Sequence, residues 1–398
     1  MRLPLFSGSR LAAACGAAAI ALAACGGGGG GSDAGTGTLR MALTDAPACG
    51  YDAVNVTIER VRVHQSSSAG ENDAGWSDVV VTPKQRVDLL SLTNGVLEEL
   101  GQTLLPAGRY TQMRLVLAPN GNNAPFANSV VPSGGSEVAL TTPSGQQSGL
   151  KFNVGIEVGA NQIADVVLDF DACKSIVPRG SSGQYNLKPV IAVTPRVIDV
   201  GRIEGYVDPS IAATTMVSAQ AGGESVKATP PDAVTGKFVL YPVPVGSYAL
   251  VLTNPARATA TVTGVPVVAA AAPTIVGAAS APLLPLAAAS APRAVAGTVT
   301  PPAAAPVRAL QTVASTPSPT QIEVAWTAAN ALDGTFSLAL PVAAPVWAPY
   351  AAAPATITFG ADNTATGLYK LQAESGGVTK EQAIDAKVVV PPVLFIFP

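Results

Sequence analysis

Hydrophobic and polar residues alternate along much of the chain with a period of two, which is typical of half-buried β-strands. Thr38–Leu43 alternates in this way, and Val54, Val56 and Ile58 share one face of the next predicted strand. The alternation then changes phase, which indicates a β-bulge near Glu59–Arg60. Further strands are predicted at residues 76–81, 110–117, 137–140, 149–156, 164–170 and 185–193, with an apolar segment at 87–92 and a short helical turn at 95–100.

Turn-forming residues separate these strands. Thr44-Asp45-Ala46-Pro47 and Pro106-Ala107-Gly108-Arg109 are turn signals. The loop Asn120-Gly121-Asn122-Asn123 is a candidate recognition tip, although a plain turn explains it better. Regular strands with turns between them predict an all-β fold, with an N-terminal β-sandwich or barrel-like domain over residues 38–199.

A weak internal repeat follows this domain. Ile203–Val207 is matched by Val295–Val299, and Gly236–Leu240 is matched by Gly334–Leu338, with a small loop insertion between the two matches. The segment from Tyr369 echoes the one from Tyr248. We therefore expect two related β-sandwich modules at residues 200–275 and 295–398. Residues 276–294, rich in Ala and Pro, are expected to form a semi-rigid linker.

The first 24 residues have the form of a lipoprotein signal peptide. Arg2 and Arg10 precede the apolar segment Leu11–Ala24, which is too short to cross a bilayer comfortably. It ends in Leu22-Ala23-Ala24-Cys25, the pattern of a lipobox, so we expect Cys25 to be lipidated. The alternative is an ordinary secretory leader in which Cys25 is incidental.

A run of glycines, Gly26–Gly31, follows the lipobox and predicts a flexible tether over residues 25–37. The expected partner is therefore membrane lipid, held through N-terminal acyl chains. An Asp directly after the lipidated Cys would favour inner-membrane retention. Gly26 stands there instead, so the expected location is the outer membrane of a bacterial cell envelope, with the facing side left open.

Four cysteines are present, and two of them belong to the leader and the lipobox. Cys15 leaves with the leader and Cys25 carries lipid, which leaves Cys49 and Cys173 in an oxidising compartment. We predict a disulfide between them. It would close a loop over residues 50–172 and contribute about 4–5 kcal/mol in the chain-entropy account. Two separate buried thiols, or a nucleophilic Cys, are the alternatives.

Five motifs occur in order along the first domain. They are Leu43–Pro47, Val54–Ile58, Asp88–Leu92, Pro106–Leu115 and Tyr185–Pro189. Together they resemble the bacterial lipoprotein family catalogued as domain of unknown function 4382. The resemblance implies an envelope lipoprotein with no established activity, and it supplies no catalytic residues.

The second module has a predicted strand at Arg202–Val207, followed by Gly236–Leu240 and then by Pro244-Val245-Gly246-Ser247-Tyr248-Ala249-Leu250. This order resembles the prealbumin-like module called the carboxypeptidase regulatory-like domain. It implies a seven-stranded β-sandwich whose fold is shared with starch-binding-type domains. The third unit would be a divergent copy of the same sandwich.

Composition and charge exclude several kinds of function. The chain has 48% hydrophobic but only 12% charged residues, about half the globular average of charge. Its formal net charge is −3, so nucleic acid is not expected as a partner. The single histidine, His64, excludes multi-His metal motifs and is expected at the surface. No metal or cofactor is expected.

Two groups of residues remain as candidate sites. Asp165, Asp169 and Asp171 have one parity and would bind Ca²⁺ or perform acid–base work, although a structural role explains them better. Trp76, Trp326, Trp347, Tyr350 and Tyr369 would offer a sugar-stacking surface, although core or edge packing is the safer interpretation.

The sequence therefore favours a membrane-anchored, extracytoplasmic lipoprotein that is not an enzyme. Display, adhesion and envelope assembly are the roles that fit such a chain. A carbohydrate-binding surface lipoprotein is the first alternative, with glycans or envelope proteins as partners. A carboxylate-based hydrolase using Asp169 and Asp171 is the second.

Overall fold

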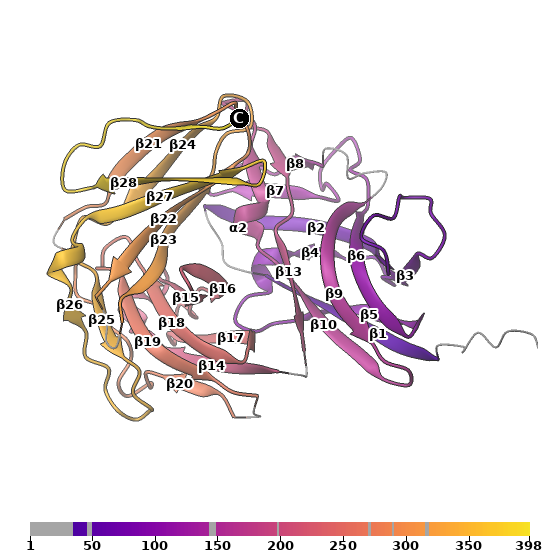
Figure 1. The fold of residues 1–398 in the computed structure, drawn as a ribbon, viewed down its shortest axis with the longest axis horizontal. Coiled ribbons are helices and arrows are strands. Elements are labelled where there is room, and N and C mark those ends of the chain that lie inside the picture. Colours follow the sequence, from indigo (N-terminus) through magenta and orange to yellow (C-terminus); the bar gives the residue numbers. More distant parts are fainter. Residues whose placement is uncertain are drawn as a thin grey trace, which may run out of the picture. The chain divides into compact units, whose positions relative to one another are not determined.

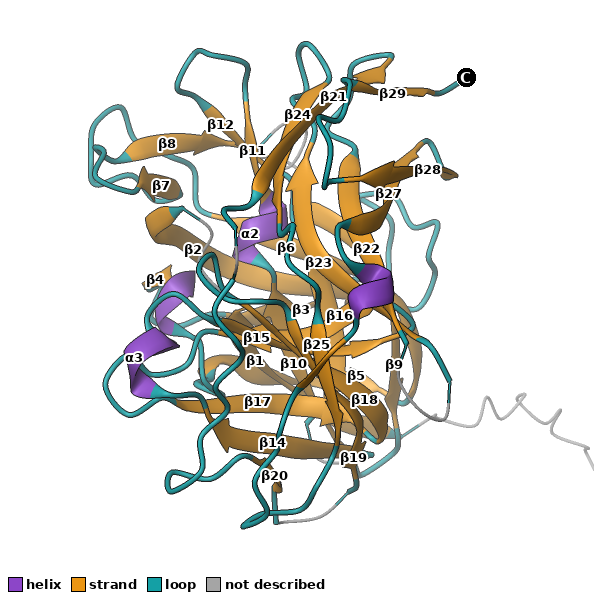
Figure 2. Cartoon of the chain, turned by 90° about the vertical axis from the view of Figure 1, so that its left-hand side faces the viewer, coloured by secondary structure: helices purple, strands orange, loops and turns teal. Residues whose placement is uncertain are grey.

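The computed structural model describes residues 35–45, 50–142, 149–196, 199–269, 272–288, 290–314 and 318–398. The predicted signal peptide, Cys25, most of the tether and Cys49 lie outside these ranges. The described residues are almost entirely β-strands and turns, which confirms the predicted all-β class (Figures 1 and 2). Residues Gly35–Pro398 form one compact unit. Within the described ranges, no helix is long and apolar enough to cross a membrane.

The first module, residues 36–195, is a sandwich of two sheets. One sheet has the order β13-β10-β1-β5, and the other has the order β11-β12-β8-β7-β2-β6-β9, with β3 and β4 also paired to β2. The strands are β1 (Thr36–Asp45), β2 (Tyr51–His64), β3 (Ser77–Val80), β4 (Arg86–Asp88), β5 (Glu98–Pro106), β6 (Gly108–Leu117), β7 (Ser129–Pro132), β8 (Val138–Thr141), β9 (Leu150–Val158), β10 (Ile163–Phe170), β11 (Ile176–Pro178), β12 (Tyr185–Leu187) and β13 (Ile191–Pro195).

The second module, residues 200–276, has a three-stranded sheet, β17-β14-β20, and supplies the four strands β16-β15-β18-β19 of a six-stranded sheet, whose other two strands come from later in the chain. A short helix, α3 (Pro209–Ala212), follows its first strand and begins at the capping residue Asp208. The strands are β14 (Val200–Tyr206), β15 (Met216–Ala221), β16 (Glu224–Thr229), β17 (Lys237–Pro244), β18 (Gly246–Thr253), β19 (Ala260–Val267) and β20 (Thr274–Val276).

The third module, residues 293–396, repeats this arrangement with the sheets β24-β21-β29 and β23-β22-β27-β28. The strands are β21 (Arg293–Thr300), β22 (Pro306–Val313), β23 (Thr320–Ala328), β24 (Thr335–Leu340), β27 (Leu368–Ser375), β28 (Val378–Asp385) and β29 (Val393–Ile396), and an insertion adds β25 (Val346–Pro349), β26 (Gly360–Ala361) and the 3-10 turn η2 (Asn363–Ala365).

The second and third modules share one arrangement of seven strands, and the first module also contains it, although no repeat was predicted there. Its first strand, β1, pairs antiparallel with β5 and parallel with β10, as β14 pairs with β17 and β20. Its other sheet contains the path β3-β2-β6-β9, the counterpart of β16-β15-β18-β19. The chain is therefore three copies of one sandwich topology, and the first copy carries the additional strands β4, β7, β8 and β11–β13.

One tyrosine hydrogen bond recurs in all three copies. Tyr110 donates its hydroxyl to the Pro106 carbonyl at 3.0 Å, and Tyr248 donates to the Pro244 carbonyl at 2.8 Å. In the third module Tyr369 donates to Pro341 at 2.6 Å, although the inserted strands separate these two residues in the sequence. The bond fixes the return of the chain from one sheet to the other, so the insertion is accommodated without changing the sandwich.

The inserted strand β25 belongs structurally to the second module. It pairs in parallel with β19, and Val346 is buried in the second module's core. The residues expected to be a free linker also pack there. Leu283 is buried in the same core and bridges to Val207, because the segment after β20 continues along the sandwich instead of leaving it.

One local prediction was wrong, and another is confirmed. The helical turn lies at Leu89–Ser91 (η1), where Asp88 accepts a hydrogen bond from the Leu90 amide, and not at residues 95–100. Asn94 and Gly95 adopt positive φ and form a turn, and β5 begins at Glu98. The predicted bulge in β2 is present, between Ile58 and Arg60.

Candidate functional site

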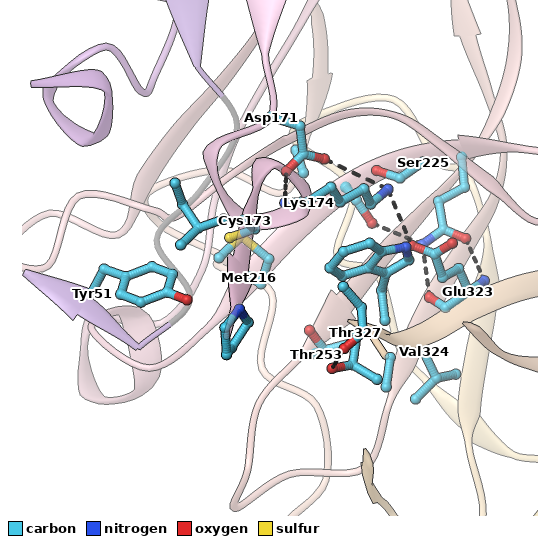
Figure 3. Close-up of a pocket in the computed structure, with 18 residues that line it drawn as sticks. Tyr51, Asp171, Cys173, Lys174, Met216, Ser225, Thr253, Glu323, Val324 and Thr327 are labelled. Atoms are coloured by element: carbon cyan, nitrogen blue, oxygen red, sulfur yellow. Dashed lines mark hydrogen bonds and ion pairs between the residues drawn. The ribbon is translucent and has the colours of Figure 1, made fainter. Parts of the chain in front are cut away.

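A pocket of about 450 Å³ lies where the three modules meet (Figure 3). The first module contributes α2 (Ala172–Ser175) and Tyr51, the second contributes residues of β15, β16 and β18, and the third contributes β23. The polar side chains in its wall are Tyr51, Asp171, Lys174, Ser218, Gln220, Ser225, Thr253, Glu323 and Thr327, and the larger non-polar ones are Ile176, Met216, Val324 and Trp326.

The short helix α2 positions the first module's charged side chains. Asp171 caps it by accepting a hydrogen bond from the Lys174 amide at 2.9 Å. The Ser175 hydroxyl donates to the Asp171 carbonyl and accepts from the Val190 amide, which fixes the helix against the following loop. Lys174 is thereby directed toward the third module, where its Nζ lies 3.5 Å from Glu323 (Figure 3).

A bulge in β23 brings Glu323 and Trp326 to one face of the strand. Glu323 pairs with Leu310 and Trp326 pairs with Arg308, and the register shifts between these pairs. Leu310 and Arg308 are two residues apart, so they share a face, and side chains of paired residues lie on the same side of a sheet. Without the bulge, residues three apart on a strand would face opposite sides.

Gln220 joins the equivalent hairpins of the second and third modules. Its side-chain amide donates to the Glu323 carbonyl at 2.9 Å and accepts from the Glu323 amide at 2.7 Å. Gln220 is buried, so this reciprocal pair is protected from water. The Arg308 Nε donates a hydrogen bond to the Glu323 carboxylate at 2.6 Å. Both the backbone and the side chain of Glu323 are therefore held by hydrogen bonds.

The electrostatics of the pocket are close to balanced. Asp171 and Glu323 are the two carboxylates, and Lys174 lies 3.6 and 3.5 Å from them. Burial raises the pKa of Asp171, and Lys174 opposes that shift. Burial, together with Tyr185, raises the pKa of Tyr51 to about 12, so its hydroxyl stays protonated at neutral pH.

The three aspartates predicted as one candidate site have separate structural roles. Asp165 is paired with Arg40, Asp169 is paired with Lys227 at 2.8 Å, and Asp171 is the helix cap. Each carboxylate has a cationic neighbour, which favours the structural interpretation. Among the residues that the structure describes, no cluster of His, Cys, Asp or Glu could hold a metal ion.

The five aromatic residues predicted as a possible stacking surface do not lie together. Trp76 is covered by Arg62 and Arg114 in the first module. Trp347 packs on the small core between the second and third modules, and Tyr369 is buried. Only Trp326 lines the pocket, where Lys174 Nζ lies 5.9 Å from its ring centre. His64 accepts a hydrogen bond from the Ser66 amide at the end of β2.

Asp171, Cys173 and Trp326 are therefore the predicted candidates that the fold brings to one place. Cys173 is disulfide-bonded. Its predicted partner, Cys49, lies outside the described residues, so the pairing of these two remains a prediction. Lys174, Gln220 and Glu323 were missed, because no sequence signal shows that residues so far apart in the chain meet.

Comparison with known families identifies the first module. Residues 36–189 match the family model described as Domain of unknown function (DUF4382). This segment is a DUF4382 domain. It supplies Tyr51 and α2 to the pocket, while the remaining wall comes from modules beyond the matched segment.

No curated protein matches the chain. A solved structure titled "The Bacillus anthracis TIE protein" aligns over 91% of this chain at 14% identity, with a TM-score of 0.17. This chain spans half the length of that protein. The TM-score is too low for the alignment to support any statement about fold or function.

Proposed function

We propose that this protein is a lipid-anchored, extracytoplasmic lipoprotein that binds or displays and does not catalyse. The observation that carries the proposal is Leu22-Ala23-Ala24-Cys25, preceded by a charged and then apolar leader and followed by Gly26–Gly31. An acylated Cys25 would hold the DUF4382 domain and its two companion modules at a bacterial membrane, with the outer membrane as the favoured location.

The geometry of the described residues supports a non-enzymatic role. A general acid or base works with a carboxyl group that is accessible and near a reacting proton. Asp169 and Asp171 instead face Lys227 and Lys174, and Asp171 also caps α2. The hydrolase alternative therefore has no observation in its favour, and Asp169→Asn with Asp171→Asn should remove no hydrolytic activity.

The anchor is tested with two cysteine variants of the full chain. Cells expressing the protein are treated with globomycin and fractionated, and the mature N-terminus is analysed by mass spectrometry. We expect an acylated Cys25 in the membrane fraction, accumulation of precursor under globomycin, and loss of acylation in Cys25→Ala. The matched control, Cys15→Ala, should be acylated normally. A soluble, unmodified mature chain would refute the proposal.

One observation favours the second candidate function, carbohydrate binding. The only tryptophan in the pocket, Trp326, is held in place by a bulge and surrounded by hydrogen-bonding side chains. The two functions are compatible, because an anchored protein can also bind a glycan.

A further inference from the structure

We propose that the pocket between the three modules binds a neutral saccharide that stacks on Trp326. The inference rests on the binding role proposed above, but it does not depend on the lipid anchor. It assigns a ligand class to a pocket that the DUF4382 domain alone does not contain, because most of its wall comes from the second and third modules.

The size of the pocket and its aromatic wall suit a sugar ring. A volume of about 450 Å³ is within the usual range for small-molecule sites and accommodates one or two sugar units. Trp326 is half-buried, so one part of its indole is packed while another faces the pocket. An indole binds the non-polar face of a pyranose well, because that face presents C–H groups to the aromatic ring.

The polar wall suits hydroxyl groups, which donate and accept hydrogen bonds. The hydroxyls of Tyr51, Ser225 and Thr253 line the pocket, and each is able to do both. Lys174 is a further donor, and its Nζ lies over the Trp326 ring, 5.9 Å from the ring centre, so a sugar stacked on the indole would share the ring with this ammonium group. Figure 3 shows these side chains on different walls of one space, which is the arrangement that fixes a ligand's orientation.

The charges argue against other ligand classes. A phosphate or carboxylate ligand would meet Lys174 but also Asp171 and Glu323, which repel it. A cation would find both carboxylates already facing Lys174, and Glu323 also bonded to Arg308. A lipid chain would leave the hydroxyls and amides of the wall without partners, which is costly. A neutral, ring-shaped, polyhydroxylated ligand meets none of these objections.

Contacts between the modules hold the walls of the pocket together. The reciprocal Gln220–Glu323 hydrogen bonds join the second module to the third, and Lys174 joins α2 to Glu323. The pocket is therefore formed before a ligand arrives, which lowers the entropic cost of binding.

The test uses the full-length chain in a detergent without a sugar headgroup. Glucose, galactose, N-acetylglucosamine and their disaccharides are titrated by calorimetry and by tryptophan fluorescence. We expect at least one of them to bind and to change the fluorescence. Trp326→Leu should weaken that binding at least tenfold, whereas Trp326→Phe, which keeps an aromatic ring, should retain most of it. The matched control Trp76→Phe alters a tryptophan outside the pocket and should leave the affinity unchanged.

A second variant separates loss of binding from loss of folding. Ser225→Leu reduces the space of the pocket without removing Trp326, and it should abolish binding while the thermal unfolding curve stays close to that of the wild type. Absence of binding by every sugar, or unchanged binding in a folded Trp326→Leu protein, would overturn the inference. Binding of adenosine in place of the sugars would assign the pocket to another ligand class and would overturn it too.

These outcomes are separate from those of the anchor experiment. Sugar binding by a chain without an acyl group on Cys25 would keep the inference and refute the lipid anchor. An acylated chain that binds no sugar would support the lipid anchor and refute the sugar-binding inference.

Discussion

Asp45 is a buried carboxylate at the end of β1 with one satisfied oxygen. Its Oδ1 accepts a hydrogen bond from the Ala172 amide at 2.9 Å, while Oδ2 has no hydrogen-bond partner in the described part of the chain. Burial raises its pKa well above the usual value, and the nearby Asp171 and Asp169 add to the shift, against the Ala172 hydrogen bond and Lys227. The ionised form is thus poorly accommodated in the fold.

Replacement of Asp45 by Asn should stabilise the protein in a pH-dependent way. A carboxyl group whose folded pKa is raised contributes its stability below the unfolded pKa of about 4, and loses it as the pH rises through the folded pKa. Asn is neutral throughout and keeps an acceptor for Ala172. We expect Asp45→Asn to unfold at higher urea concentration than the wild type at pH 8, with a smaller difference at pH 4.

Asp232→Asn is the control for this effect. The Thr235 side chain and amide donate to Asp232 and lower its pKa, so this carboxylate stabilises the fold above its unfolded pKa and stops doing so as the pH falls. The substitution should therefore destabilise at pH 8 and have little effect at low pH. Equal responses of the two variants to pH would contradict the account of Asp45.

Gly297 shows how strongly a single position can be constrained by packing. A Cβ there would lie 2.3 Å from the ring of Phe336 and 2.4 Å from the Val393 carbonyl, and the equivalent Gly205 is equally crowded. We expect Gly297→Ala to reduce the free energy of unfolding by about 1–3 kcal/mol, measured by urea denaturation. Gly121→Ala, where nothing lies within 4 Å, should change it by less than about 0.5 kcal/mol.

At the scale of single elements, strands were easier to predict than turns. The alternation of residues 38–43 predicted a strand, and β1 covers them with Leu39, Met41 and Leu43 in the sandwich core, although Ala42 on the opposite face is buried as well. The helical turn was misplaced because Asp88 and not a residue near Gly95 supplies the cap. The linker was mispredicted because composition does not reveal that one residue, Leu283, finds a place in a core.

The pocket shows a different limit on what the sequence can predict. Asp171, Cys173 and Trp326 were each identified as candidates, but no periodicity shows that a helix cap in one module faces a strand in another. The bulge in β23 places Glu323 and Trp326 on the same face of the strand. Its position depends on the register with the partner strand β22, which the sequence around Glu323 does not specify. The tyrosine bonds of the first two modules, by contrast, follow a local Pro-x-Gly-x-Tyr pattern, so the sequence alone carries a signal for them.

The strand β25 couples two modules at the level of a single element. It lies within the third module's sequence, yet Val346 is buried against the second module's core. Val346→Ala should therefore cost about 1–3 kcal/mol and increase hydrogen exchange in β19 more than in β28. Val378→Ala, at a partly exposed position of β28, is the control and should be nearly neutral. Faster exchange confined to the third module would refute the assignment of β25 to the second.

At the scale of the whole described unit, polar contacts between modules are numerous and specific. The backbone N–H of Asn94 donates to the Thr229 hydroxyl at 2.8 Å, and the Asn94 side-chain oxygen accepts from the Val239 backbone N–H at 3.1 Å. The Tyr241 hydroxyl donates to the Arg196 carbonyl at 3.0 Å. Three similar sandwiches thus have different contact surfaces, because the side chains at the joining positions differ from one module to the next; Asn94 lies in a turn, whereas Val239 and Tyr241 lie within β17. The pocket depends on that arrangement and not on any one module.

The ion pair Lys227–Asp169 should make the first and second modules depend on each other for stability. Its atoms are 2.8 Å apart, and the side chains of Lys227 and Asp169 are only 2% and 12% exposed. Removing one partner leaves a buried charge uncompensated, so Lys227→Met should cost about 3–5 kcal/mol. Lys237→Met removes a lysine that is 42% exposed and pairs with Glu204, which Arg202 also contacts, so it should cost only about 0–1 kcal/mol.

A double variant tests whether the unpaired charge of Asp169 causes the loss of stability expected in Lys227→Met. The double variant Lys227→Met with Asp169→Asn removes both charges, so it should recover most of the lost stability in urea denaturation. If the two substitutions were simply additive, the loss would come from packing of the lysine stem and not from the unpaired carboxylate. Recovery would show that the unpaired Asp169 carboxylate, and not the lost packing of the lysine stem, destabilises the Lys227→Met variant.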